Sequence, residues 1–339
     1  MDKPGQMPLQ DKVHDLLETL QISSHPQLPH NTDHSQEPSH HHHLHAAASR
    51  HSHGHHLLQV EDLSISFSMY DSTAEHYLLA RHRQSQVIHN LHISVHTGEI
   101  VAIVGASGSG KTLLADAIMG LFAANATLSG RIWFDGVEQD ADSLHALRGH
   151  GISLVPQSVS CLDPLMRVGL QVQGFASGRQ RQQRSRWRLE RQQRQAELFD
   201  RYGLDEGVAR LYPFELSGGM ARRVLLCCAL MDEPQVIIAD EPTPGLDPRL
   251  ARQAFADFRQ FADQGGGVLL ITHDIELALE VADRIAVFKD GTVVEETAVA
   301  NFASADTLEH PFSKALWHAL PEHGFIAAAD TALEHESGV

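Results

Sequence analysis

The chain has 339 residues, of which 42% are apolar, and its formal net charge is −17 at pH 7, with 43 acidic against 26 basic residues. An apolar share of this size lets most of the chain bury a core, as one large domain or two. The acidic balance argues against broad contact with the phosphate backbone of nucleic acid, so we expect no nucleic-acid partner.

The first 56 residues have a biased composition. Residues 21–56 are dominated by His, Ser, Pro, Gln and Asn and hold almost no branched apolar residues. Such a segment cannot bury enough surface to offset the entropy of ordering, so we predict a disordered His-rich tail over residues 1–56. Within it, one apolar patch predicts one or two helical turns: Val13, Leu16, Leu17 and Leu20.

Two extended segments follow the tail. Apolar residues between 57 and 67 are typical of a strand with a break, and residues 87–95 alternate clearly enough to pair with that strand. We predict an antiparallel β lobe here, at the start of a domain that spans residues 57–300.

Short apolar strands mark the core of this domain. Residues 100–104 run straight into a glycine-rich loop and a helix, and further buried strands are predicted at 151–155, 236–239 and 268–271. Because helical stretches separate these strands, we predict an α/β core with a largely parallel sheet.

A helical insertion and a C-terminal extension complete the predicted fold. Residues 163–216 show little strand signal and many helix-forming residues, which predicts a helical subdomain inserted into the core. An Asp-Gly turn between residues 285–288 and 292–295 predicts a hairpin. The extension over 301–339 is expected to hold a short helix at 311–319 and to fray at its end.

Residues 105–112, GASGSGKT, fit the phosphate-binding pattern G-x-x-x-x-G-K-[ST], and they lie between a strand and a helix as that pattern requires. Glycines let backbone N–H groups turn toward phosphate oxygens, and the helix N-terminus adds partial positive charge. Lys111 reaches the β and γ phosphates and Thr112 ligates magnesium, so we expect ATP and Mg²⁺ as cofactors. The residues expected to hold the phosphates are Gly105, Ser107, Gly108, Gly110, Lys111 and Thr112.

The apolar strand at 236–239 ends in two carboxylates, Asp240 and Glu241. Asp240 is expected near the metal, and Glu241 is our candidate for the base that polarises the attacking water. Two adjacent acids at a strand end are, taken alone, more often a solvated turn. A phosphate-binding loop on the same sheet favours the catalytic interpretation.

A second glycine-containing segment, LSGGM at 216–220, precedes a helix predicted over 221–231. Ser217 is expected to cap this helix, while Gly218 and Gly219 expose backbone donors to an anion.

Six elements, in this order and spacing, resemble the ATPase domain of ABC transporters over residues 57–291. They are the phosphate-binding loop, Gln157 after a strand, LSGG, the strand with Asp240-Glu241, Gly245-Leu246-Asp247, and His273 after a strand. The resemblance implies a P-loop NTPase fold with an N-terminal antiparallel β lobe and an inserted helical subdomain.

The resemblance also implies roles for single residues. Two ATPase domains would face each other head to tail, so that Ser217, Gly218 and Gly219 serve the nucleotide of the partner. The implied catalytic set is Glu241, His273, Lys111 and Gln157, and the implied magnesium ligands are Thr112, Gln157 and Asp240. The remaining roles are coupling to the transmembrane subunit for Gln157, γ-phosphate contact for His273, bridging of the two domains for Asp247, and adenine stacking for Phe67, with Tyr70 as a second candidate.

One departure from the family is visible at residues 220–223, MARR, where Gly/Gln, Gln/Arg, Gln and Arg are common. We expect altered fine geometry there without loss of activity.

Two segments resemble the peptide/nickel import subfamily: residues 160–169, SCLDPLMRVG, and 310–316, HPFSKAL. Many peptide importers of this subfamily carry a cysteine cluster after the second segment. This chain has no cysteine beyond Cys228 and ends shortly after Leu320, as nickel members do, which favours nickel as cargo. Dipeptides, oligopeptides and a metal–chelator complex remain the alternatives.

Twelve of the 25 histidines fall between residues 25 and 56. Imidazole suits nickel, copper and zinc, and His-x-His spacing lets a chain wrap one ion with several nitrogens. A reservoir or sensor for the imported metal is one interpretation; a functionally neutral tail and a purification tag are the others, and irregular spacing disfavours the tag. The candidate nickel ligands are His40, His41, His42, His43, His53, His55 and His56.

The three cysteines have neither disulfide-framework nor zinc-site spacing, so we predict buried thiols in a reducing cytoplasm: Cys161, Cys227 and Cys228. Residues 1–20 do not resemble a signal peptide and no apolar stretch of about 18 residues occurs, so we expect neither secretion nor a membrane span. The arginine-rich stretch 179–194 is by default a solvated helix face, with contact to transmembrane subunits or anionic lipid headgroups as the alternative.

The sequence therefore predicts an ATP-hydrolysing subunit of an ABC importer at the cytoplasmic face of the bacterial inner membrane. Its expected partners are a second ABC ATPase subunit, usually a paralogue in this subfamily, two transmembrane permease subunits and, indirectly, an extracytoplasmic solute-binding protein. Two rivals are a soluble ABC protein acting on DNA or ribosomes, which usually has two cassettes or a long coiled coil, and a metal-storage protein whose ATPase is secondary.

Overall fold

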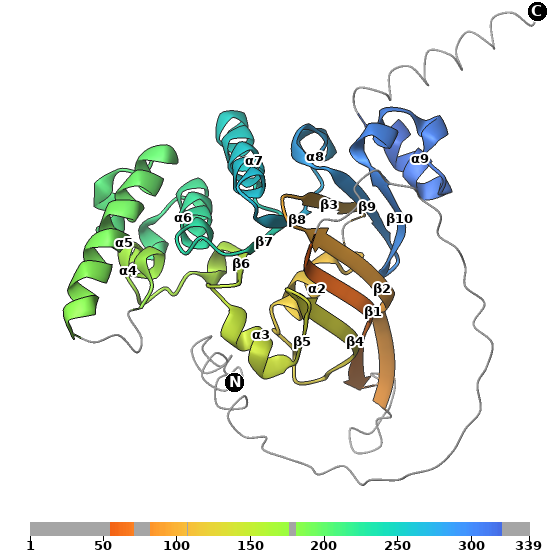
Figure 1. The fold of residues 1–339 in the computed structure, drawn as a ribbon, viewed down its shortest axis with the longest axis horizontal. Coiled ribbons are helices and arrows are strands. Elements are labelled where there is room, and N and C mark those ends of the chain that lie inside the picture. Colours follow the sequence, from red (N-terminus) through yellow and green to blue (C-terminus); the bar gives the residue numbers. More distant parts are fainter. Residues whose placement is uncertain (1–54, 71–81, 107, 176–180, 321–339) are drawn as a thin grey trace, which may run out of the picture. The chain divides into compact units, whose positions relative to one another are not determined.

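The computed structural model describes residues 55–70, 82–106, 108–175 and 181–320, which belong to one compact unit. The chain forms a four-stranded sheet of order β2-β1-β4-β5 and a six-stranded sheet of order β10-β9-β3-β8-β7-β6 (Figure 1). The predicted α/β fold with an antiparallel lobe is confirmed. No helix of the described residues is long and apolar enough to cross a membrane.

The β lobe is antiparallel throughout. Its strands are β1 (His56–Tyr70), β2 (His82–His96), β4 (Ala126–Phe134) and β5 (Val137–Gln139). The predicted break in β1 appears as a register shift between Val60 and Leu63, where Asp62 has φ 51°. The first strand begins at His56, the last residue of the predicted tail.

The six-stranded sheet holds the strands that the sequence predicted. These are β3 (Ile100–Gly105), β6 (Ile152–Val155), β7 (Val236–Asp240), β8 (Gly267–Ile271), β9 (Arg284–Lys289) and β10 (Thr292–Ala298). All neighbours run parallel except β10, which forms the predicted antiparallel hairpin with β9. Every residue of β7 and β8 is buried, as expected for parallel strands covered on both faces.

Two hydrophobic cores lie on opposite faces of this sheet, and β3 contributes alternate residues to each. Val101 and Ile103 pack with the β lobe and with α2 (Lys111–Ile118). Ala102 and Val104 pack with α6 (Gly218–Leu230) and α7 (Pro248–Asp263). Helices α2 and α6 therefore cover opposite faces of one sheet (Figure 1).

The predicted insertion is helical in its described part. It holds α4 (Val168–Gln173), α5 (Arg181–Arg201) and short 3₁₀ turns at Glu206–Arg210 and Pro213–Glu215. Tyr202 follows α5, and its buried hydroxyl donates to Asp257 Oδ2 of α7 at 2.6 Å, which fastens the insertion to the core. Within the described residues the other α-helices are α3 (Ala141–Leu147), α8 (Ile275–Val281) and α9 (Pro311–His318), the last being the predicted C-terminal helix.

The prediction that all three cysteines are buried is wrong for one of them. Cys227 is buried and Cys228 is half-buried, but Cys161 is exposed. It ends a short 3₁₀ turn, Val159–Cys161, after β6, in a loop that lies at the surface of the domain.

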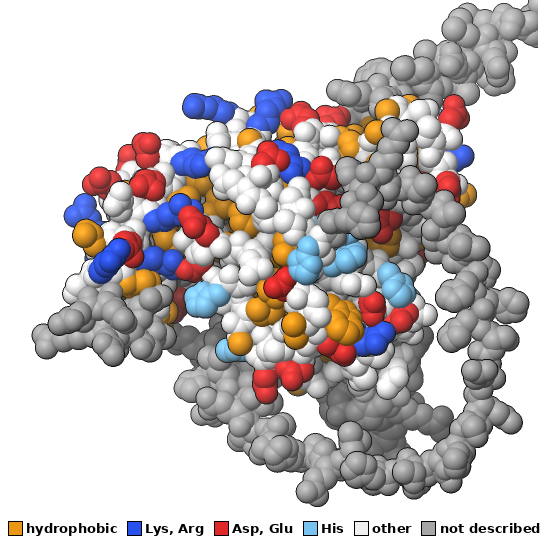
Figure 2. All heavy atoms as spheres, in the orientation of Figure 1, with side chains coloured by type: hydrophobic (Ala, Val, Ile, Leu, Met, Phe, Trp, Pro, Cys, Tyr) orange, Lys and Arg blue, Asp and Glu red, His pale blue; other side chains and the backbone are white. Residues whose placement is uncertain are grey.

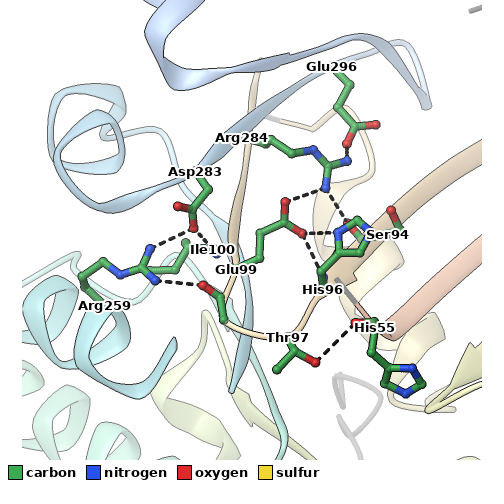
Figure 3. A network of polar contacts seen from close by, with 11 residues as sticks. His55, Ser94, His96, Thr97, Glu99, Ile100, Arg259, Asp283, Arg284 and Glu296 are labelled. Carbon is green, nitrogen blue, oxygen red and sulfur yellow. Dashed lines mark hydrogen bonds and ion pairs between the residues drawn. The ribbon is translucent and has the colours of Figure 1, made fainter. Parts of the chain in front are cut away.

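A polar network joins the lobe to the parallel sheet (Figure 3). The buried carboxylate of Glu99 accepts from the backbone N of His96 at 2.8 Å and from Arg284 Nη1 at 2.8 Å, and it lies 2.7 Å from His96 Nδ1. Arg284, at the start of β9, also pairs with Glu296 of β10. The network thus ties β2, β3, β9 and β10 together at one end of the sheet.

Glu99→Gln is expected to lower the free energy of unfolding at pH 7 by about 1–3 kcal/mol, because Arg284 loses a charge-assisted acceptor. Burial alone would raise the pKa of Glu99, but the hydrogen bond and charge of Arg284 and the bonds from His96 outweigh it and lower that pKa below its ordinary value of 4.5. The stabilisation is therefore present above that value and lost as the pH falls through the folded pKa. Urea titrations at several pH values test this, and the variant should show a flatter acid limb.

The matched control for this prediction is Glu138→Gln, an exposed carboxylate on β5. It should leave both the stability at pH 7 and the acid limb as in the wild type. An equal effect of the two substitutions would contradict a special role for Glu99.

Candidate active site

The carboxyl ends of four parallel strands bring several of the predicted site residues to one edge of the six-stranded sheet. In spatial order the strands are β3, β8, β7 and β6, and they lead into the loops that begin at Gly105, Thr272, Glu241 and Pro156. Open α/β sheets bind ligands at this edge, because parallel strands deliver all of their following loops to the same side.

The phosphate-binding loop lies between β3 and α2. Gly105 must lack a side chain, because a Cβ there would lie 2.0 Å from the carbonyl oxygen of Phe288. Gly110 has φ 108° at the N-cap of α2, in the left-handed region that favours glycine. Lys111 Nζ donates to the carbonyl oxygens of Gly105 at 3.0 Å and Ala106 at 2.8 Å, which directs the ammonium over the loop.

Lys111 is only 7% exposed, and burial lowers its pKa, while the charges of Glu241 and Asp240 oppose that shift. The ammonium therefore lies in the field of both carboxylates. Ser107, the remaining predicted loop residue, lies outside the described residues.

Asp240 ends β7 and is 2% exposed. Its side chain accepts a hydrogen bond from Thr112, and its Oδ1 is buried without a hydrogen-bond partner in the described residues. Burial raises the pKa of Asp240 to about 6, with the charges of Glu241 and Asp116 adding to the rise and Thr112 and Lys111 opposing it. A buried acceptor of this kind beside a hydroxyl fits a hard divalent cation such as Mg²⁺, so Asp240 and Thr112 suit the predicted metal role.

Glu241 and His273 form a direct pair. Glu241 Oε2 lies 2.6 Å from His273 Nδ1, and the Glu241 backbone N–H donates to the carbonyl of Ile271 at 2.8 Å. Glu241 has φ 48°, a conformation that non-glycine residues adopt rarely and that often marks functional sites. The glutamate is 8% exposed, whereas the His273 side chain is 69% exposed and faces the solvent side of the site.

Gln157 follows β6, and its backbone carbonyl accepts from Arg222 Nη2 at 2.5 Å. Ser217 caps α6 as predicted, because its Oγ accepts from the Met220 N–H at 3.3 Å, and Gly218 begins the helix. A Cβ on Gly219 would lie 3.0 Å from the carbonyl of Gly245, so the LSGG segment touches the loop before α7.

Asp247 caps α7 by accepting from the N–H groups of Arg249 and Leu250, at 3.0 and 3.1 Å. In the described residues no hydrogen bond or ion pair joins the LSGG segment to the phosphate-binding loop. The roles of Ser217, Gly218, Gly219 and Asp247 toward a partner domain stay predictions.

Phe67 lies on β1, half-buried against the core of the lobe, and its adenine-stacking role stays a prediction. The second candidate, Tyr70, is the last residue of β1. A hollow of about 360 Å³ lies beside the phosphate-binding loop, between Gly105, Ala106 and His273 on one side and α9 on the other.

The predicted nickel ligands divide into two groups. His40, His41, His42, His43 and His53 lie outside the described residues. His55 pairs with Asp135, and the ring of His56 lies 4.3 Å from that of His96, with burial and His96 lowering the pKa of His56. Within the described ranges no cluster of three or more His, Cys, Asp or Glu residues suits a metal ion, although several histidines lie across the middle of the face in Figure 2.

Comparisons with known proteins agree with this geometry. The family described as ABC transporter matches residues 88–244. The chain is 33% identical over 244 residues to the oligopeptide transport ATP-binding protein OppD of Lactococcus lactis subsp. cremoris, covering 70% of each chain. It is 31% identical over 293 residues to the peptide transport system ATP-binding protein SapD of Salmonella typhimurium, covering 83% of this chain and 82% of the relative. The chain belongs to the ATP-binding proteins of the ABC transporter family.

A solved structure supports the same fold. The ATP-binding cassette MJ0796, a dimer in a post-hydrolysis state bound to ADP and Pi, matches with a TM-score of 0.59 and 26% identity, over 71% of this chain and 98% of that one. Members of the ABC family bind ATP and couple its hydrolysis to transport.

Asp240→Asn is expected to raise the Mg²⁺ concentration for half-maximal ATPase activity by about 10- to 100-fold, because the neutral amide loses the charge that holds the cation. Titration of MgCl₂ at saturating ATP measures the shift. Asp290→Asn, at an exposed turn, is the control and should leave the curve in place. Overlapping curves for Asp240→Asn and the wild type would remove Asp240 from the metal site.

Proposed function

We propose that this chain is the ATP-hydrolysing subunit of an ABC importer that takes up oligopeptides at the cytoplasmic face of a bacterial inner membrane. The Glu241–His273 pair beside the phosphate-binding loop carries the proposal, because it places an acceptor for the proton of the attacking water next to a donor for phosphate. A second ATPase subunit, usually a paralogue, and two permeases complete the transporter, and an extracytoplasmic binding protein delivers the cargo.

Hydrogen-bond chemistry assigns the roles within the pair. An ionised carboxylate only accepts, so His273 Nδ1 carries the proton in the 2.6 Å contact, and Glu241 Oε1 stays available to accept from the attacking water. His273 Nε2 then donates to the γ phosphate when the ring is doubly protonated. The pair thereby orients the attacking water and stabilises charge on the oxygens of the γ phosphate.

The phosphate-binding loop neutralises the other side of the reacting phosphate. Lys111 exchanges its contacts with the loop carbonyls for phosphate oxygens, and the loop N–H groups and the start of α2 orient the chain of phosphates. Asp240 and Thr112 would hold Mg²⁺, which when bound polarises the β and γ phosphates. The partly buried position of Lys111 strengthens each of these contacts.

The arrangement of the two glycine-containing segments supports a head-to-tail pair of ATPase subunits. Because α2 and α6 cover opposite faces of the sheet, the loops at their N-termini belong to different surfaces. Ser217, with Gly218 and Gly219, is then free to face the nucleotide of the second subunit, in the role that the family assigns to this segment.

The cargo assignment rests on the relatives. OppD and SapD are peptide transporters by name, with 33% and 31% identity, which favours peptides over the nickel that the C-terminal segment favoured. Nickel stays as a second candidate on one observation, the twelve histidines between residues 25 and 56. A metal–chelator complex is the third candidate cargo.

Uptake in cells with and without this gene separates these cargoes. We expect the null strain to lose uptake of a radiolabelled oligopeptide and to keep uptake of radiolabelled nickel. Loss of nickel uptake alone would replace the peptide assignment with nickel and leave the ATPase assignment in place.

A further inference from the structure

A buried arginine of α6 connects the LSGG helix to the loop that carries Gln157. Arg222 is 5% exposed, and its guanidinium donates from Nη1 to the carbonyl of Pro156 at 2.8 Å and from Nη2 to the carbonyl of Gln157 at 2.5 Å. These are two consecutive carbonyls, so the planar fork of one arginine fixes both peptide units. Arg222 lies five residues after Ser217, within the first turns of the same helix.

Arg222 is also one of the positions in the segment 220–223 that differ from the residues common in the family. In the MARR segment it occupies the position where glutamine is common. A glutamine side chain presents one amide nitrogen, whereas the guanidinium presents a rigid fork of donors, and the arginine adds a full charge.

Arg222 is buried, and the charges of the two acids at the end of β7 act on it. Burial lowers its pKa, and the charges of Asp240, Cys161 and Glu241 oppose that shift. Its Nε is buried without a hydrogen-bond partner in the described residues. A buried charge that leaves one donor unsatisfied is costly, so packing alone is a poor reason for this residue.

We propose that Arg222 is a positioning residue that fixes the backbone of Gln157 to the LSGG helix, so that a displacement of this helix by the partner's nucleotide moves Gln157 relative to Asp240. The inference rests on the proposed function, in which Gln157 serves the magnesium site and the LSGG segment serves the second nucleotide. Two hydrogen bonds join Arg222, near the N-terminus of α6, to the carbonyls of Pro156 and Gln157. A shift of α6 is therefore transmitted directly to the loop that carries Gln157.

Steady-state kinetics of the assembled transporter, purified through a tag on this full-length chain, test the proposal. We expect Arg222→Ala to lower kcat about 5- to 10-fold and to raise the half-saturating Mg²⁺ concentration by a similar factor, with the KM for ATP changed less than about twofold. Arg222→Lys, which keeps the charge without the fork, should recover part of both effects. Arg222→Gln introduces the residue that is common in the family. If Arg222→Ala does not fold, kcat and the half-saturating Mg²⁺ concentration are measured on Arg222→Gln instead.

The matched control is Arg148→Ala. Arg148 also forks onto two consecutive carbonyls, with Nε donating to Met119 at 2.8 Å and Nη2 to Gly120 at 2.8 Å, and burial lowers its pKa too. These contacts lie at the far end of α2 and do not reach the Gln157 loop. The control should lower the melting temperature as much as Arg222→Ala does, without moving the Mg²⁺ curve.

A double-mutant cycle with Gln157→Ala gives the decisive result. If Arg222 acts through Gln157, adding Arg222→Ala to the Gln157→Ala variant should change kcat less than about twofold. Additive effects of the two substitutions, or wild-type kinetics for both Arg222→Ala and Arg222→Gln, would overturn the inference. Failure of the proposed function looks different, because Glu241→Gln would then hydrolyse ATP at the wild-type rate.

Discussion

Glu241→Gln is expected to lower the rate of ATP hydrolysis by about 10²- to 10⁴-fold while MgATP binding stays within about twofold of the wild type. The amide has the shape of the carboxylate but accepts no proton from the attacking water. The backbone hydrogen bond from Glu241 to Ile271 does not depend on the side chain, so the fold should be retained. Turnover by phosphate release and nucleotide affinity by fluorescence titration measure the two quantities separately.

The control for this substitution is Glu280→Gln, an exposed carboxylate on α8 close in sequence to His273. Its turnover should equal that of the wild type. Unchanged turnover in Glu241→Gln would remove Glu241 from catalysis, and a matching loss in the control would point to a general effect of charge.

Lys111→Met is expected to weaken ATP binding by about 10- to 100-fold, which corresponds to the roughly 1.5–3 kcal/mol of a hydrogen bond to a charged group. Methionine keeps the length and the apolar stem of the side chain but brings no charge to the phosphates. Because Lys111 is nearly buried, solvent does not replace its contacts with phosphate oxygens. Equilibrium binding of ATP without Mg²⁺ isolates this effect from metal binding.

Lys314→Met serves as the control, because Lys314 lies on α9 but does not line the hollow beside the phosphate-binding loop; it should bind ATP as the wild type does. Equal affinities for Lys111→Met and the wild type would contradict the assignment of Lys111 to the β and γ phosphates. A loss of binding that follows a loss of folded protein in thermal melts would reduce Lys111 to a structural residue.

The parallel core and its loops were predictable because their signals are local. A short apolar run followed by glycines or acids predicts a buried strand and places the next polar side chains at its carboxyl end. Lys111 after β3 and Asp240 at the end of β7 are examples. Ser217 was predicted as a cap for the same reason, since the cap lies within three residues of the N–H group that it accepts from.

Features that depend on distant partners were not predicted. Strands β4 and β5 were not predicted. Most residues of β4 are exposed or half-buried, so the alternation of apolar and polar residues along it is weak. The hydrogen bonds from Arg222 to the carbonyls of Pro156 and Gln157 join residues that are 66 and 65 positions apart. In the sequence, only the unusual MARR segment indicated that Arg222 differs from the family. The contact between Glu241 and His273 spans 32 positions and likewise required the sheet order to be known.

The identity of the cargo could not be predicted from the sequence for a different reason. In the proposed transporter the solute contacts the permeases and the binding protein, so the sequence of the ATPase carries only indirect evidence of the cargo. The C-terminal segment and the histidines favoured nickel, whereas overall similarity favours peptides. Residues that do not contact the cargo are weak evidence of its identity.

The most direct test of the account is oligopeptide uptake by a strain lacking this gene, complemented with the wild-type chain or with Glu241→Gln at equal expression. We predict that the wild type restores uptake and that Glu241→Gln does not, while both assemble with the membrane subunits. Full uptake with Glu241→Gln would contradict the claim that hydrolysis at this site drives import.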